Sequence, residues 1–198
     1  TALFLIEHGI DVVLLERSDK PHADPRAATY HPPTLEMLEK SGVTAELHQR
    51  GLIARHWQLR DRQAGLIAEF DLAVLGEDTR YPYRLQCEQH KLVEMMQRRV
   101  MQSPHSRVLH GVDVEAISQD ESGVTVRARK ENGDCIIRGR WLVGADGGRS
   151  IVRKSQDIPF EGFTWAERFL VITTDFDFAR QGYAFSSYTM DPIEWVAT

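Results

Sequence analysis

Glu16 and Arg17 are the first residues of the chain whose types and position suit a chemical task. They end a short apolar run, residues 12–15, whose β-branched and aliphatic side chains predict a strand buried on both faces. A helix predicted over residues 1–8, with Gly9 at its end, precedes this strand. Helix, strand and terminal acid match the second half of a dinucleotide-binding βαβ unit, in which a carboxylate accepts hydrogen bonds from ribose hydroxyls.

In such a unit the acid follows a glycine-rich turn by about 20 residues. Counting back from Glu16 places that turn upstream of Thr1, so we expect the chain to be a piece of a larger protein. Without the turn this piece should bind a dinucleotide poorly, because no helix N-terminus would hold the pyrophosphate. The alternative is a plain surface strand, since many of these also end in a glutamate.

A second constellation is the stretch WLVGADGGRSIVR, residues 141–153, in which an apolar strand is predicted to enter a glycine-rich turn. Asp146 and Gly147 lie in this turn, where small residues let the backbone approach a ligand closely. Arg149 and Arg153 follow on a predicted helical turn, available for phosphate groups. The alternative is an ordinary strand-to-helix turn in which Asp146 caps the helix.

Two single residues complete the set of candidates. Arg26 lies in a Pro-containing loop ten residues after Glu16, within reach of a bound nucleotide if the loop folds back. Gln86 stands near the start of a helix of about four turns predicted within residues 84–104, where its amide can donate to a ligand oxygen. For both residues the alternative is a side chain that is simply solvated.

The remaining pattern predicts the elements that position these residues. Helical spacing predicts a helix over residues 34–42, and alternation around a glycine predicts a hairpin over residues 57–75. A three-stranded antiparallel unit is predicted over residues 107–141, with a turn at its ENGD sequence. Strand-like stretches follow at residues 168–178 and 183–190.

Composition and charge exclude several classes of protein. Of the 198 residues 42% are apolar and 27% are charged, which is typical of a soluble globular protein. The net charge of −5 gives no basic footprint for nucleic acid, and no apolar run approaches the roughly 20 residues of a membrane span. Cys87 and Cys135 match no zinc or redox motif, so we expect reduced thiols in a cytoplasmic protein and no metal site.

In their order and spacing these segments resemble the flavoprotein aromatic hydroxylases, the single-component FAD-dependent monooxygenases of the para-hydroxybenzoate hydroxylase type. The resemblance covers essentially the whole chain, and GADG is its most specific motif. The sequence PFEGFTWAERFLVI, directly after that motif, is most similar to the branch that acts on phenols and hydroxyphenylpropionate-type acids. The segments that carry the resemblance are Glu16-Arg17, Arg26 before TLEML, Gln86 before KLVE, and GADGGRSIVR.

The resemblance implies a role for each candidate. Glu16 would bind the adenosine ribose of FAD, with the arginine after it against the adenosine side. Arg26 would reach the FAD pyrophosphate, near the path of the nicotinamide cofactor. Gln86 would lie near the ribityl-phosphate region. Asp146 and Gly147 would form the DG motif, which the family associates with both FAD and NAD(P)H binding.

The implied reaction is hydroxylation of a phenolic or other aromatic substrate. In the family NAD(P)H reduces the flavin, O₂ adds at the flavin C4a position, and the hydroperoxide transfers an oxygen atom to the ring. The protein supplies orientation, exclusion of water and electrostatics. The implied partners are a small aromatic substrate and O₂, with no nucleic acid and no membrane, and a homodimer is left open. No residue is assigned as catalytic, because no spacing ties a base to a site.

The expected fold is α/β. A Rossmann-like FAD-binding domain over residues 1–158 would carry an antiparallel three-stranded β-meander, and residues 159–198 would start a β-rich substrate domain. Two alternatives stay open for the function. Related flavoproteins of the same fold reduce isoprenoid double bonds, epoxidise alkenes or halogenate indoles, although the Trp-containing halogenase motif is not found in the sequence. The other alternative is a non-catalytic FAD-binding module.

Overall fold

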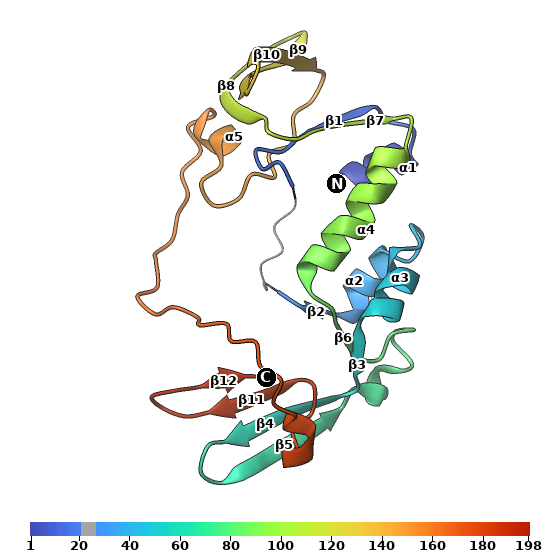
Figure 1. Cartoon of the computed structure of the whole chain (residues 1–198), viewed down its shortest axis with the longest axis vertical. Helices are drawn as coiled ribbons and strands as arrows, with labels where there is room; N and C mark the ends of the chain where they lie inside the picture. Colours follow the sequence, from blue (N-terminus) through green and yellow to red (C-terminus); the bar gives the residue numbers. More distant parts are fainter. Residues whose placement is uncertain (21–26) are drawn as a thin grey trace. The chain divides into compact units, whose positions relative to one another are not determined.

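The computed structural model describes residues 1–20 and 27–198 (Figure 1). These residues form two compact units, each built from two stretches of chain. Unit 1 holds the described residues up to 20 together with Arg99–Leu170, and unit 2 holds residues 27–98 together with Val171–Thr198. Within the described ranges, no helix combines the length and the apolar character that crossing a bilayer requires.

Unit 1 contains a parallel pair of strands and an antiparallel meander (Figure 1). Its elements are α1 (Ala2–Glu7), β1 (Val12–Leu15), β7 (Ser106–Leu109), β8 (Asp113–Asp120), β9 (Gly123–Lys130), β10 (Gly133–Gly139) and α5 (Ile151–Lys154). The meander has the order β10-β9-β8 and pairs antiparallel throughout. Its central strand buries Val124, Val126 and Ala128. The predicted three-stranded antiparallel unit is therefore confirmed.

Strand β1 follows α1 through a turn at Gly9, whose φ of 70° glycine adopts without strain. The strand pairs in parallel with β7, placing Val12 opposite Ser106. The prediction that this strand is buried on both faces is wrong, because Val13 is 45% exposed. Side chains alternate along a strand, and the described residues of unit 1 leave the Val13 side open.

Two stretches that the sequence predicts as strands are not strands. Residues 141–143 and 168–177 have no regular hydrogen-bonded structure. Apolar composition is not enough for a strand, because the backbone N–H and C=O groups need a neighbouring strand to pair with. In the described part of the chain neither stretch has such a neighbour.

Unit 2 contains a three-stranded antiparallel sheet of order β2-β6-β3 and the long helix of the chain (Figure 1). Its elements up to that helix are β2 (Thr29–Tyr30), α2 (Pro32–Met37), α3 (Val43–Arg50), β3 (Leu52–Ala54), β6 (Arg84–Gln86) and α4 (Gln89–Gln102), whose last residues belong to unit 1. The side chains of Leu35, Leu47, Leu85 and Met95 are fully buried. Met95 is therefore part of the apolar core of unit 2.

The structure shifts the bounds of two predicted helices. The helix expected over residues 34–42 begins at Pro32, because proline fits the first turn of a helix, and it ends at Met37. The helix expected within residues 84–104 begins only at Gln89. The residues before it form β6, since this strand lies between β2 and β3 and pairs with both. Pairing on two sides outweighs a local helical pattern.

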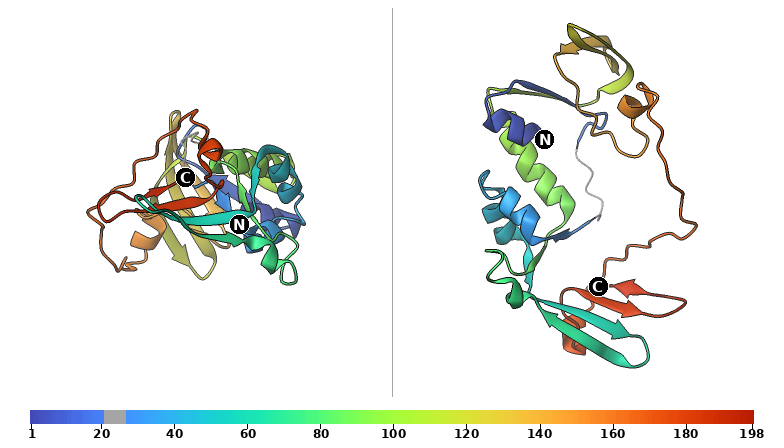
Figure 2. Two further views of the ribbon diagram at one scale, coloured as in Figure 1. Left: turned by 90° about the horizontal axis from the view of Figure 1, so that it is seen from below. Right: turned by 180° about the vertical axis from the view of Figure 1, so that it is seen from behind.

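A four-stranded sheet of order β12-β11-β4-β5 completes unit 2 (Figure 2). Its strands are β4 (His56–Asp61), β5 (Gly65–Asp71), β11 (Ser187–Met190) and β12 (Val196–Ala197), and two short 3₁₀ helices accompany them, η1 (Leu72–Leu75) and η2 (Phe178–Gln181). β4 and β5 form the predicted hairpin, and β11 pairs in parallel with β4. The sheet thus joins strands from both sides of the predicted domain boundary at residue 158, and that boundary stays a prediction.

Candidate functional site

The glycine-rich turn of unit 1 is organised around the carboxylate of Asp146. One carboxylate oxygen accepts hydrogen bonds from the backbone N–H of Ile151 at 2.7 Å and of Val152 at 3.2 Å, and the other accepts from the Ser150 hydroxyl. Ser150 Oγ in turn accepts from the backbone N–H of Arg153 at 3.0 Å. The helix-capping role that the sequence leaves as an alternative for Asp146 is therefore present.

These hydrogen bonds also set the charge of the turn. Slight burial acts to raise the pKa of the Asp146 carboxyl, but the hydrogen bonds from Ser150, Val152 and Ile151 outweigh it and the pKa lies below its ordinary value. Hydrogen bonds donated to a carboxylate favour its ionised form. Asp146 is thus a fixed anion at the start of α5.

Two glycines of the turn are required for different reasons. Gly147 has a φ of 76°, a conformation that a residue with a side chain adopts only under strain. A Cβ atom on Gly144 would lie 2.8 Å from Cβ of Val152, so only glycine lets α5 approach this closely. Gly144 was not a predicted site residue, although its place in the GADGG sequence is a signal for it.

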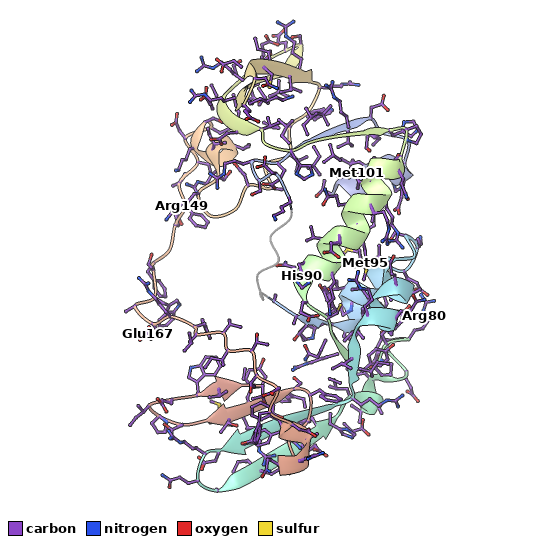
Figure 3. The ribbon with its side chains drawn as sticks, viewed as in Figure 1. Arg80, His90, Met95, Met101, Arg149 and Glu167 are labelled. Carbon is purple, nitrogen blue, oxygen red and sulfur yellow. The ribbon has the colours of Figure 1, made fainter. Side chains whose placement is uncertain are left out.

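The two arginines after the turn differ. Arg153 Nη1 donates to the carbonyl of Gly148 at 3.1 Å, and its guanidinium lies 4.7 Å from the centre of the Phe160 ring. These contacts hold Arg153 within its own segment. Arg149 is exposed and extends beside α5 (Figure 3).

Glu16 lies directly after β1, where its backbone extends the ladder with β7. Its N–H donates to the Leu109 carbonyl at 2.9 Å, and its own carbonyl accepts from Val112 at 3.0 Å. Its carboxylate accepts a hydrogen bond from the backbone N–H of Ser18 at 2.7 Å. Glu16 and Arg17 are both exposed. The structure therefore presents an accessible carboxylate at the end of a parallel strand, as the sequence predicts.

Gln86 lies in unit 2 on β6, not at the start of a helix. Its Oε1 accepts a hydrogen bond from the Thr29 hydroxyl at 2.8 Å, and its Nε2 donates to the Phe185 carbonyl at 3.4 Å. Neither partner was predicted, because they are 57 and 99 residues away in the sequence and no local pattern signals such pairs. Arg26 lies outside the described residues.

The structure brings the candidates together only in part. Glu16, Arg17, Asp146 and Gly147 belong to unit 1, and Gln86 belongs to unit 2. The hydrogen bonds of Glu16 described above join it to residues 18, 109 and 112, whereas those of Asp146 join it to residues 150–152. Asp146 is thus positioned by its own segment, whereas Glu16 and Gln86 also depend on segments distant in the sequence.

Comparison with known protein families shows to which family a chain with this strand-terminal acid and glycine-rich turn belongs. The family model described as the FAD binding domain matches residues 1–191. The chain belongs to this family of FAD binding domains. Its α/β fold with strand-terminal acid and glycine-rich turn is thus that of an FAD-binding domain.

Individual relatives narrow the similarity further. The chain is 33% identical over 195 residues to a para-nitrophenol 4-monooxygenase of Pseudomonas sp. strain WBC-3, covering 98% of the chain and 48% of the relative. It is 31% identical over 194 residues to a 6-hydroxy-3-succinoylpyridine 3-monooxygenase of Pseudomonas putida, covering 98% and 49%. The crystal structure of a p-nitrophenol 4-monooxygenase from Pseudomonas putida matches 99% of this chain and 50% of that one, with a TM-score of 0.92 and 32% identity. The chain spans about half the length of the curated relatives it matches.

The described residues fit FAD at two places. The accessible carboxylate of Glu16 can accept hydrogen bonds from a ribose diol, which requires an acceptor with room around it. Gly147 carries no side chain, and a Cβ atom built there would meet no atom within 4 Å, so its backbone faces open space. Open backbone beside a fixed turn is suited to close approach by a cofactor.

Proposed function

We propose that the protein to which this chain belongs is an FAD- and NAD(P)H-dependent monooxygenase that hydroxylates a phenolic or other aromatic compound. The observation that carries the proposal is the match of 99% of the chain, at a TM-score of 0.92, to a p-nitrophenol 4-monooxygenase. That match takes in both the glycine-rich turn and the four-stranded sheet. Function follows from such a site rather than from the fold alone, so the proposal needs a direct test.

When bound, FAD would accept electrons from NAD(P)H and activate O₂ for transfer to the aromatic ring. The residues of this chain would bind and orient it. Glu16 would accept hydrogen bonds from the adenosine ribose, and Arg17 would lie against the adenosine. Arg26 would meet the pyrophosphate, although it lies outside the described residues.

The remaining candidates would act on the middle of the cofactor. An N–H of Gln86 would donate to a ribityl or phosphate oxygen. Asp146 would act indirectly through its hydrogen bonds to Ile151 and Val152, which fix the turn that presents the backbone of Gly147. We assign no catalytic base, and residues 159–198, which carry β11 and β12, are proposed as the start of the substrate domain.

The test uses the purified full-length protein. A flavin absorption spectrum should appear after loading with FAD, and NADH or NADPH oxidation should accelerate with a phenol from a panel that includes nitrophenols and hydroxyphenylpropionate. Incorporation of one atom from ¹⁸O₂ into the product would establish hydroxylation. A protein that takes up no FAD, or that oxidises NAD(P)H at one rate whatever phenol is present, would contradict the proposal.

A further inference from the structure

The side-chain amide of Gln86 is held at both ends by residues distant in the sequence. Thr29 stands directly opposite Gln86 in the antiparallel pairing of β2 with β6, so the two side chains project from the same face of the sheet. The Thr29 hydroxyl lies 2.8 Å from Gln86 Oε1, and the Phe185 carbonyl oxygen lies 3.4 Å from Nε2. Each end of the amide therefore has its own partner.

The chemistry of these partners fixes which way the amide points. A backbone carbonyl only accepts hydrogen bonds, so the end of the amide facing Phe185 must be the NH₂ group. The oxygen then faces Thr29, whose hydroxyl must donate to it. A flipped amide would put two acceptors against each other at Phe185, whereas the Thr29 hydroxyl, which can donate or accept, could bond either end. The Phe185 carbonyl therefore selects the orientation, and the Thr29 hydroxyl holds the amide in it by donating to Oε1.

The segment that carries the Phe185 carbonyl is held by Gln58, a residue of β4 that is 4% exposed. Gln58 Oε1 accepts from the backbone N–H of Ala184 at 3.1 Å, and Gln58 Nε2 donates to the Gly182 carbonyl at 3.2 Å. The guanidinium of Arg84, two residues before Gln86, donates to the Ser186 hydroxyl at 2.9 Å. The segment around Phe185 is thus anchored on both sides, and it gives the amide a fixed acceptor.

We propose that Thr29 is a positioning residue for the cofactor: its hydroxyl holds the Gln86 amide so that an N–H, not the oxygen, is available to FAD. An amide NH₂ carries two N–H groups, and the described residues provide an acceptor for one of them, at Phe185. The ribityl and phosphate oxygens of FAD are acceptors, so an N–H attracts them and a carbonyl oxygen repels them. This inference rests on the proposed contact between Gln86 and FAD.

The test is FAD affinity of the full-length protein, measured by titrating the apoprotein and following flavin fluorescence, with the visible circular dichroism of bound flavin as a second readout. Thr29→Val keeps the shape and removes the donor, and it should weaken FAD binding about 10-fold and alter the dichroism. Thr29→Ser keeps the donor and should stay within about 2-fold of the wild type. In a Gln86→Leu background, Thr29→Val should have no further effect, because its partner is gone.

Three results would overturn the inference: unchanged FAD affinity in Thr29→Val, an equal loss in Thr29→Ser, or a loss that persists in the Gln86→Leu background. Far-ultraviolet circular dichroism of the apoproteins checks folding, and Thr29→Ala replaces Thr29→Val if the valine variant does not fold. A wild-type protein that binds no FAD defeats this inference and the proposed function together. A wild type that hydroxylates phenols, with FAD affinity unchanged by Gln86→Leu, defeats this inference alone.

Discussion

The glycine-rich turn of unit 1 and the Gln86 strand of unit 2 are built in opposite ways. The hydrogen bonds of Asp146 reach residues at most six positions along the chain. Those of Gln86 span 57 and 99 positions. A turn made of local contacts can form wherever its sequence occurs, whereas the Gln86 amide is oriented only when two sheets have assembled. The turn should therefore tolerate distant mutations that the strand does not.

The largest expected effect comes from Gln58, which anchors the segment beside Gln86. Gln58→Leu removes the partner that the buried Gln58 amide provides to the part-buried Ala184 N–H and Gly182 carbonyl. We expect a loss of about 3 kcal/mol in the free energy of unfolding, since unsatisfied buried polar groups are costly. Chemical denaturation of the full-length protein measures it.

The matched control for this change is Gln63→Leu, at an exposed position of the β4–β5 turn. It should cost less than about 0.5 kcal/mol. FAD affinity should fall in Gln58→Leu and hold in the control. Equal free energies of unfolding in the two variants would show that the hydrogen bonds of Gln58 do not stabilise the region around Gln86.

The next largest effect is expected at Gly51, which ends α3 against the back of β6. A Cβ atom there would lie 2.8 Å from the Gln86 carbonyl oxygen and 3.0 Å from that of Leu47. Because both neighbouring atoms belong to the backbone, Gly51→Ala must displace β6. We expect the free energy of unfolding to fall by about 2 kcal/mol and FAD binding to weaken. Gly139→Ala serves as the control, because its Cβ would meet no atom closer than 3.4 Å. If Gly51→Ala and Gly139→Ala have the same free energy of unfolding and the same FAD affinity, the expected dependence of the Gln86 strand on its distant neighbours is wrong.

An added Cβ atom at Gly144 in unit 1 tests whether contacts within its own segment hold the glycine-rich turn together. Gly144→Ala would push Val152 away from the turn and should cost about 1–2 kcal/mol. Val152→Ala in the same protein should restore part of that stability, because it removes the two methyl carbons at 2.9 and 3.2 Å, and a cycle of single and double variants measures the coupling. Additive effects would mean that the two residues do not touch in the way the structure shows.

The smallest effect is expected for the cap itself. Asp146→Ala should lower the free energy of unfolding by about 1 kcal/mol near neutral pH, because it removes the carboxylate that accepts from the first two N–H groups of α5 while the N-cap residue, Ser150, stays in place. The folded-state pKa of Asp146 lies below its ordinary value of about 4. At a pH above that ordinary value, the Asp146 carboxylate therefore makes its full contribution to the free energy of unfolding. The contribution is lost as the pH falls through the lower folded-state pKa. Stability of wild type and variant measured between pH 7 and pH 2 should therefore converge at the acid end, and a gap that widens toward low pH would contradict the assignment.

The sequence predicts well those parts of the molecule that local contacts build. The meander of β8, β9 and β10 follows from alternation and a turn, and the GADGG turn follows from residues that cap and bend the chain. The β4–β5 hairpin is likewise read from its own residues. Membership in the FAD binding domain family agrees with the function that these motifs together indicate.

Prediction fails where a distant segment decides the local structure. Residues 84–86 look helical together with the residues after them, yet they form a strand because β2 and β3 lie on either side. Residues 141–143 are apolar enough for a strand but have no partner in the described part of the chain. Thr29 and Phe185 could not be assigned to Gln86 at all, since nothing in a linear pattern pairs residues so far apart.

By itself the sequence determined which residue types stand at each candidate position: a carboxylate after a strand, an Asp-Gly pair in a turn, and an amide before a long helix. Backbone preference and short-range hydrogen bonding are enough to build the first two. Only the tertiary structure decided how the amide of Gln86 is oriented. Its direction is selected by the Phe185 carbonyl, which only accepts, and is held by the Thr29 hydroxyl, and folding brings both of these partners to Gln86.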